Sequence, residues 1–113
     1  MEPARAADLL ARERERIESA LDEFERERRE EIERDDQHGE DRSAAMAMDE
    51  RDEAIADRLH AELEALERAE RRLAEGTYGL SIESGEPIPE ERLEARPTAE
   101  RTVEEQARYD RGG

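Results

Sequence analysis

The feature that most constrains this chain is a long run without a helix-breaking residue, in which apolar side chains recur every seven positions. Residues 4–34 contain no Gly or Pro, and they consist mainly of Ala, Arg, Glu and Leu, which favour helices. Leu10, Ile17 and Phe24 stand seven residues apart, and Leu21 joins them. The pattern predicts one helix with a narrow apolar stripe, like a coiled-coil seam, and charged remaining faces.

A second helical run follows a short turn. Gly39 interrupts the first run, and Asp41 or Ser43 is a candidate cap for the next helix. That helix is predicted over residues 42–75, and Gly76 is expected to end it. Its apolar stripe consists of Met48, Ile55, Leu59, Leu63, Leu66 and Leu73. Two such helices joined by a short turn are predicted to pack as an antiparallel hairpin roughly 45 Å long.

The charge of the chain restricts its partners. It carries 35 acidic and 19 basic residues, all of the latter Arg, for a net charge of -16. Nucleic acid and anionic membranes are not expected as direct partners, because phosphate binding needs a basic surface. A basic partner, or a channel with basic walls, fits better, although the same charge also serves solubility. With no apolar run long enough to span a membrane and no apolar signal segment, a cytoplasmic monomer is expected.

The C-terminal module, residues 76–113, has a different character from the predicted hairpin of residues 1–75, whose tip falls at about 35–43. Its local patterns predict a short strand at Leu80–Ile82, a small helix from Pro89 toward Leu93, and a last helix over residues 99–108 capped by Thr98. Its apolar side chains are expected to pack together and against the hairpin near Leu73; they are Tyr78, Leu80, Ile82, Ile88, Leu93 and Val103.

Three motifs in the second half of the chain carry a family resemblance. "GTYG", "SGEPIP" and "RLEARPTA" resemble the C-terminal zinc module of the DksA/TraR bacterial transcription factors. At the level of motifs the resemblance extends over residues from about 35 to 107. It implies a mainly α fold in which a long antiparallel helical hairpin precedes a small zinc-finger-like module and a short C-terminal helix.

The resemblance also identifies the positions of the four zinc ligands. They fall on Ser81, Ser84, Thr102 and Glu105, and cysteines there would give the spacing C-x2-C-x17-C-x2-C, a strong zinc signature. Structural zinc prefers thiolates or imidazoles, so a degenerate finger that binds no metal is expected. The three hydroxyls are expected to hydrogen-bond among themselves or to backbone amides of the loop. Alternatively, Thr102 and Glu105 simply begin a solvated helical face.

For function, the resemblance implies an RNA polymerase-binding protein whose hairpin enters the secondary channel, with acids of its tip near the catalytic centre. The candidate tip acids are Asp35, Asp36, Glu40 and Asp41. The family's tip motif, D-x-x-D-x-A, falls on His38, Asp41 and Ser43, so only the second Asp matches.

The sequence is less consistent with other functions. Family members that respond to the alarmone ppGpp use basic residues, which match Ala65, Arg96 and Gln106 here. Only Arg96 is charged, so neither ppGpp dependence nor another cofactor is expected. The alternative is a non-catalytic interaction hairpin that binds some other basic partner. An enzyme is not expected, because the chain has no Cys, two His and no Gly-rich phosphate loop.

Overall fold

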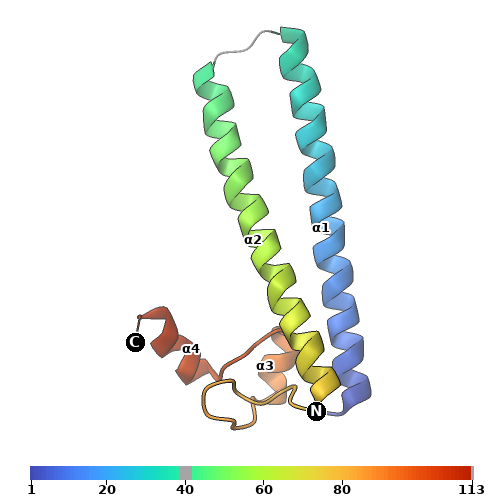
Figure 1. Ribbon diagram of the computed structural model, residues 1–113, viewed down its shortest axis with the longest axis vertical. Coiled ribbons are helices and arrows are strands. Elements are labelled where there is room, and N and C mark those ends of the chain that lie inside the picture. Colours follow the sequence, from blue (N-terminus) through green and yellow to red (C-terminus); the bar gives the residue numbers. More distant parts are fainter. Residues whose placement is uncertain (39–41, 113) are drawn as a thin grey trace. The chain divides into compact units, whose positions relative to one another are not determined.

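The described residues form four helices. The computed structural model describes the backbone of residues 1–38 and 42–112, and the side chains of residues 1–34 and 50–112. In chain order the helices are α1 (Pro3–His38), α2 (Arg42–Glu75), α3 (Glu90–Ala95) and α4 (Val103–Asp110), as Figure 1 shows. The predicted mainly α fold, with a long hairpin followed by a small module that ends in a short helix, is confirmed.

The two long helices have the bounds that their sequences indicate. The predicted helix 42–75 is confirmed, and α1 extends four residues beyond the predicted end at residue 34. The end of α2 has a local cause. Gly76 has a positive φ of 84°, and the amides of Gly76 and Thr77 donate to the carbonyls of Leu73 and Arg72 at 3.3 and 2.8 Å. These two bonds form a Schellman motif, which satisfies carbonyls that the helix end leaves free.

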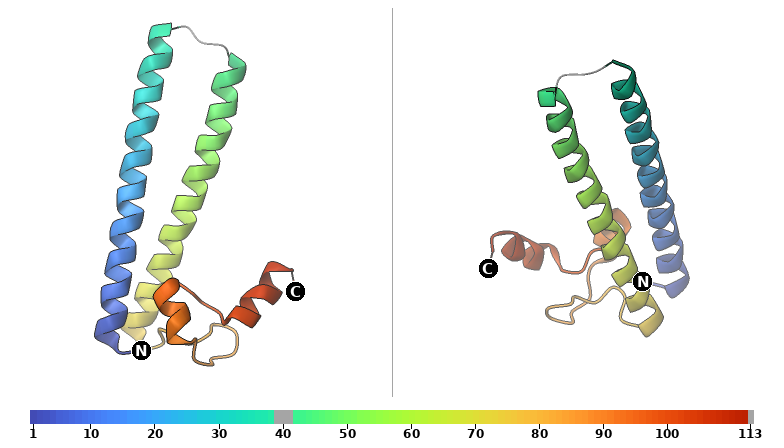
Figure 2. Two further views of the ribbon diagram at one scale, coloured as in Figure 1. Left: turned by 180° about the vertical axis from the view of Figure 1, so that it is seen from behind. Right: turned by 45° about the horizontal axis from the view of Figure 1, so that its top comes forward.

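Two compact units divide the long helices between them. One comprises residues 15–64, and the other comprises residues 1–14 together with 65–113. Within each unit, segments of α1 and α2 lie side by side and antiparallel in both views of Figure 2. The division of the chain into a hairpin domain, residues 1–75, and a C-terminal module remains a prediction.

The described members of the predicted apolar stripes contribute to the seam of each unit, whereas the side chain of Met48 lies outside the described side chains. In residues 15–64, Ile17 and Leu59 are buried and Phe24 is half-buried, while the ion pair between Arg16 and Glu62 spans 3.5 Å. In the other unit the buried side chains include Leu10, Leu66 and Ala69, and Arg14 donates two hydrogen bonds to Glu70 at 3.1 and 2.6 Å. None of the described helices is both long enough and apolar enough to cross a bilayer.

The C-terminal module has a smaller core than its sequence suggested. Ile88, Leu93 and Ala99 are buried together, and Met1 and Tyr78 pack against them. Leu80, Ile82 and Val103, which were expected to join this core, are 38%, 49% and 59% exposed. That expectation was wrong. Leu80 and Ile82 lie in a loop rather than a strand, with one isolated bridge between Leu80 and Pro87, and Val103 is the first residue of α4.

The last helix also starts later than predicted. Thr102, not Thr98, is the N-cap of α4, and the helix covers residues 103–110 rather than 99–108. Ala99, expected to be the first helical residue, is instead buried in the core of the module. Both threonines are plausible caps locally, but only Thr102 has a glutamate three residues later, and this pair makes a capping box.

Substitutions of two leucines in this module should differ in their effect on stability, because one leucine lies in the core and the other is exposed. Leu93→Ala should lower the free energy of unfolding by about 2–5 kcal/mol, because Leu93 is 1% exposed and the change leaves a cavity. Leu80→Ala is the matched control, and it should cost about 1 kcal/mol or less. Urea unfolding of both variants checks this. An equal loss in the two variants would contradict the assignment of the core.

Candidate functional site

The four positions that the resemblance links to zinc all lie in the C-terminal module. Ser81 lies in the loop after α2 and is 5% exposed, while Thr102 caps α4 and Glu105, in the first turn of that helix, is 7% exposed. Ser84 lies three residues after Ser81 in the same loop. We call these four residues the Glu105 cluster.

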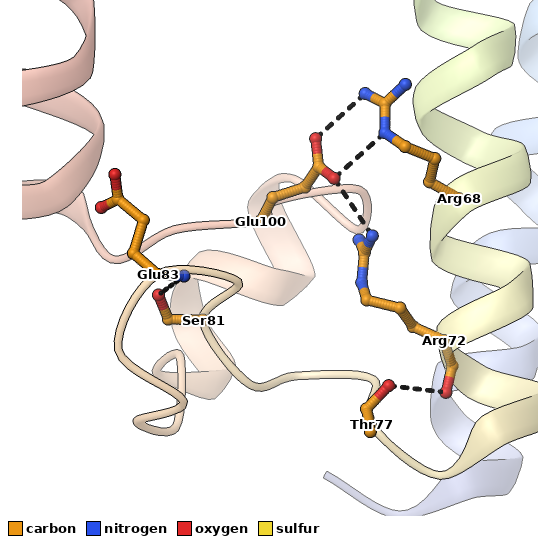
Figure 3. A network of polar contacts seen from close by, with 6 residues as sticks. All are labelled: Arg68, Arg72, Thr77, Ser81, Glu83 and Glu100. Carbon is orange, nitrogen blue, oxygen red and sulfur yellow. Dashed lines mark hydrogen bonds and ion pairs between the residues drawn. The ribbon is translucent and has the colours of Figure 1, made fainter.

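Each hydroxyl of the Glu105 cluster accepts hydrogen bonds from backbone amides. Ser81 Oγ accepts from the amides of Glu83 and Ser84 at 3.1 and 3.2 Å, and Ser84 Oγ accepts from the amide of Glu86 at 3.2 Å. The first of these bonds is drawn in Figure 3. Thr102 Oγ1 accepts from the amide of Glu105 at 3.2 Å. The prediction that these hydroxyls bind loop amides is therefore confirmed for the two serines.

The carboxylate of Glu105 is the centre of the cluster. The amide of Thr102 donates to Glu105 Oε1 at 2.8 Å, which completes the capping box. This backbone bond, together with hydrogen bonds from the Ser81, Ser84 and Thr102 hydroxyls, lowers the pKa of Glu105 to about 2. Burial acts in the opposite direction, but bonds to the charged form outweigh it. The alternative that Thr102 and Glu105 begin a solvated face was wrong.

This donor set does not fit a structural zinc ion. Three of the four positions offer neutral hydroxyls that backbone amides already engage, and the fourth offers a single carboxylate that its neighbours surround with donors. A zinc finger places anionic thiolates around a cation. The Glu105 cluster reverses that polarity, because it places hydrogen-bond donors around an anion. In the described part of the chain, no group of three or more His, Cys, Asp or Glu side chains is placed to hold a metal.

A second polar network joins the module to α2. Arg68 donates to the Glu100 carboxylate through Nε and Nη2 at 3.1 and 3.0 Å, and Arg72 Nη1 donates at 3.1 Å (Figure 3). Burial raises the pKa of Glu100, but hydrogen bonds and charge from the two arginines outweigh burial and bring it below its ordinary value. No sequence pattern indicated this network, since Glu100 is 28 residues away from Arg72.

The three positions matched to the alarmone site line one pocket. Ala65, Arg96 and Gln106 border a cavity of about 260 Å³. Sequence reasoning missed three further arginines in its lining, namely Arg68, Arg92 and Arg101. Each of them has an internal contact: Arg68 binds Glu100, Arg92 Nε donates to the carbonyl of Arg101 at 2.7 Å, and Arg101 lies 3.8 Å from the centre of the Tyr109 ring. The expectation of no ppGpp dependence, argued from Arg96 alone, remains a prediction.

The predicted tip acids fall outside the described side chains. Asp35 and Asp36 belong to the last turn of α1, and their side chains are not described. Glu40 and Asp41 lie outside the described residues altogether. His60, by contrast, is exposed on α2, and its Nδ1 lies 2.8 Å from the carbonyl oxygen of Ala56.

The Glu105 cluster predicts a specific pH dependence of stability. Because the pKa of Glu105 is about 2 in the folded chain against an ordinary 4.5, its contribution is present above pH 4.5 and is lost as pH falls toward 2. Glu105→Gln keeps the shape but offers the hydroxyls an uncharged amide. The excess stability of the parent over Glu105→Gln, measured by urea unfolding, should therefore shrink between pH 5 and pH 2.5.

Glu104→Gln, a change at the adjacent exposed position, is the control for that series. Its difference from the parent should stay small at every pH. A stability difference between the parent and Glu105→Gln that does not change with pH would contradict the hydrogen-bonded carboxylate.

Comparisons with known proteins agree with this architecture. A family model for the prokaryotic dksA/traR C4-type zinc finger matches residues 76–111. The RNA polymerase-binding transcription factor DksA of Caulobacter vibrioides is 43% identical over 72 residues, which are 60% of this chain and 51% of that protein. General stress protein 16O of Bacillus subtilis is 51% identical over 45 residues, 40% of this chain and 28% of that protein. The chain thus spans about half or less of the length of these curated relatives.

A solved structure extends the likeness to nearly the whole chain. Transcription factor DksA2 from Pseudomonas aeruginosa aligns with 96% of this chain and 83% of its own, with a TM-score of 0.59 and 30% sequence identity. The alignment therefore includes the long helices as well as the module. The chain belongs to the DksA/TraR family, in a form that contains no cysteine.

Proposed function

We propose that this protein is a zinc-independent transcription regulator that binds RNA polymerase through its secondary channel, with the acids of its hairpin tip near the active site. The observation that carries the proposal is the 43% identity, over 72 residues, to a factor named for binding RNA polymerase. The relatives are named as transcription and stress factors, which supports a non-catalytic role. We further propose that the protein acts as a cytoplasmic monomer, without direct contact to nucleic acid or membrane.

The distribution of charge supports entry into a basic channel. Most of the net charge of -16 falls within residues 15–64, the unit that contains the hairpin turn. A strongly acidic hairpin is attracted by basic walls or bound cations, and this attraction raises the rate of association. Co-purification with the source organism's RNA polymerase, with and without a known secondary-channel protein as competitor, tests the proposal. Binding that the competitor does not reduce would contradict the proposed entry route.

The alternative proposal is a structural hairpin that binds a different basic partner. The observation that favours it is the altered tip, where His38 and Ser43 stand in place of the first Asp and the Ala of the family motif. Both proposals share the fold, and they differ in whether the tip acids change transcription.

The first prediction of this proposal concerns metal. The purified protein should contain no stoichiometric zinc, and a chelator should change neither its helical circular dichroism nor its unfolding midpoint, because the Glu105 cluster offers no thiolate. A variant with cysteine at all four positions serves as the positive control, and it should bind one zinc ion per chain. One zinc per chain in the parent protein by elemental analysis would refute zinc independence.

The second prediction separates binding from effect at the tip. Asp41→Asn and Asp36→Asn change charge with little change of shape, so polymerase affinity should survive while the effect on transcription falls. Asp57→Asn, at an exposed position of α2, is the control and should leave both unchanged. Transcription is measured in the source organism's own system at equal polymerase occupancy. If both tip variants and their combination match the parent protein, the tip mechanism is wrong and the alternative proposal gains support.

A further inference from the structure

Glu100 connects three parts of one unit. Its carboxylate binds Arg68 and Arg72, which lie four residues apart on α2, while its carbonyl oxygen accepts a hydrogen bond from the amide of Ile82 at 2.9 Å. In Figure 3 its side chain points toward the two arginines of α2. One residue therefore links α2, the loop that carries Ser81, and the segment that leads into α4.

Two further described ion pairs join the module to residues 1–14. Arg5 reaches Glu94 at 3.6 Å with both side chains about half exposed, and the terminal amine of Met1 lies 3.3 Å from a largely exposed Glu90. The Arg5 pair is exposed on both sides and contributes little, and the Met1 pair is open to solvent on the side of Glu90 although Met1 is 3% exposed. Glu100 and Arg72, in contrast, are 15% and 14% exposed, and their bond is charge-assisted and directional.

Apolar contact by itself does not fix the orientation of the module. The core of Ile88, Leu93 and Ala99 is small, and burial of apolar surface has no directional preference. Two guanidinium groups around one carboxylate do impose a direction, because the fork of Arg68 faces both oxygens of Glu100. The second Nη of Arg72 is buried without a hydrogen-bond partner among the described residues. Arg72 thus keeps its position beside Glu100 at the cost of one unsatisfied donor.

We propose that Glu100 is a positioning residue that fixes the orientation of the C-terminal module on α2. Loss of its charge releases the module from α2 without unfolding the Glu105 cluster, which is held by separate bonds. A merely stabilising role would instead lower the melting temperature and leave the orientation unchanged. The effect on polymerase binding rests on the proposed function, whereas the orientation does not.

Spin labels can measure the orientation directly, because the chain has no native cysteine. Labels at Glu67→Cys on α2 and Arg108→Cys on α4 report one distance within this unit, and both positions are exposed. In the parent protein the distance distribution should have one narrow maximum. In Glu100→Gln it should broaden and gain a second maximum, while circular dichroism remains that of a folded chain. Glu104→Gln, the same change at an exposed position, should match the parent.

A distribution for folded Glu100→Gln that is identical to that of the parent would overturn the proposal. If Glu100→Gln does not fold, Arg68→Gln removes two of the three hydrogen bonds to the carboxylate, and it should give a partial broadening. Unfolding of both variants would also overturn the proposal, since it would make the network a stabiliser of the fold rather than a positioning device.

Polymerase affinity provides the functional readout. If binding requires the fixed orientation, Glu100→Gln should weaken affinity by on the order of tenfold, because only the oriented fraction of molecules binds. Glu104→Gln should not. Failure of the parent protein to bind polymerase would refute the proposed function, while the distance measurement would still decide the role of Glu100. Unchanged affinity together with a broadened distribution would refute the functional part of the inference.

Discussion

The carboxylate of Glu105 organises the C-terminal module. The amide of Thr102 donates a hydrogen bond to it, and the hydroxyls of Ser81, Ser84 and Thr102, each of which accepts from a backbone amide, help to lower its pKa. The loop at Ser81 and the start of α4 are therefore tied to one charged group. Without these bonds, the rest of the module would depend on the small core around Leu93 and on the network of Glu100.

The electrostatics of the Glu105 cluster differ from those of a structural zinc site. A structural zinc ion supplies on the order of 10 kcal/mol of folding free energy in a small module, but it requires deprotonated ligands and so responds to chelators and oxidants. The Glu105 cluster needs only an ionised glutamate, which its donors maintain down to low pH. The same loop path thereby folds around an anion, and the module has no thiol that an oxidant could modify.

The parts of the fold that could be predicted from the sequence are those that local signals determine. The seven-residue stripes and Gly76 give the bounds of α2 and place the end of α1 within four residues, because helix propensity and C-capping act over a few neighbouring positions. The start of α4 was missed although its signal, Thr102 followed by Glu105, was present in the sequence. The contact of Glu100 with α2 could not be predicted, since it depends on a tertiary approach that no periodicity encodes. The exposure of Val103 could not be predicted either, since it also depends on tertiary packing. Side-chain type alone does not indicate which apolar residues a small core can include.

Titration of the Glu105 side chain tests the central claim most directly. In protein labelled with ¹³C, the carboxyl carbon of Glu105 can be followed by NMR as the pH is lowered while the module remains folded. The hydrogen bonds of the cluster predict a midpoint near pH 2. A midpoint near the ordinary value of 4.5 would mean that Glu105 is solvated, and it would contradict the hydrogen-bonded carboxylate at the centre of the cluster.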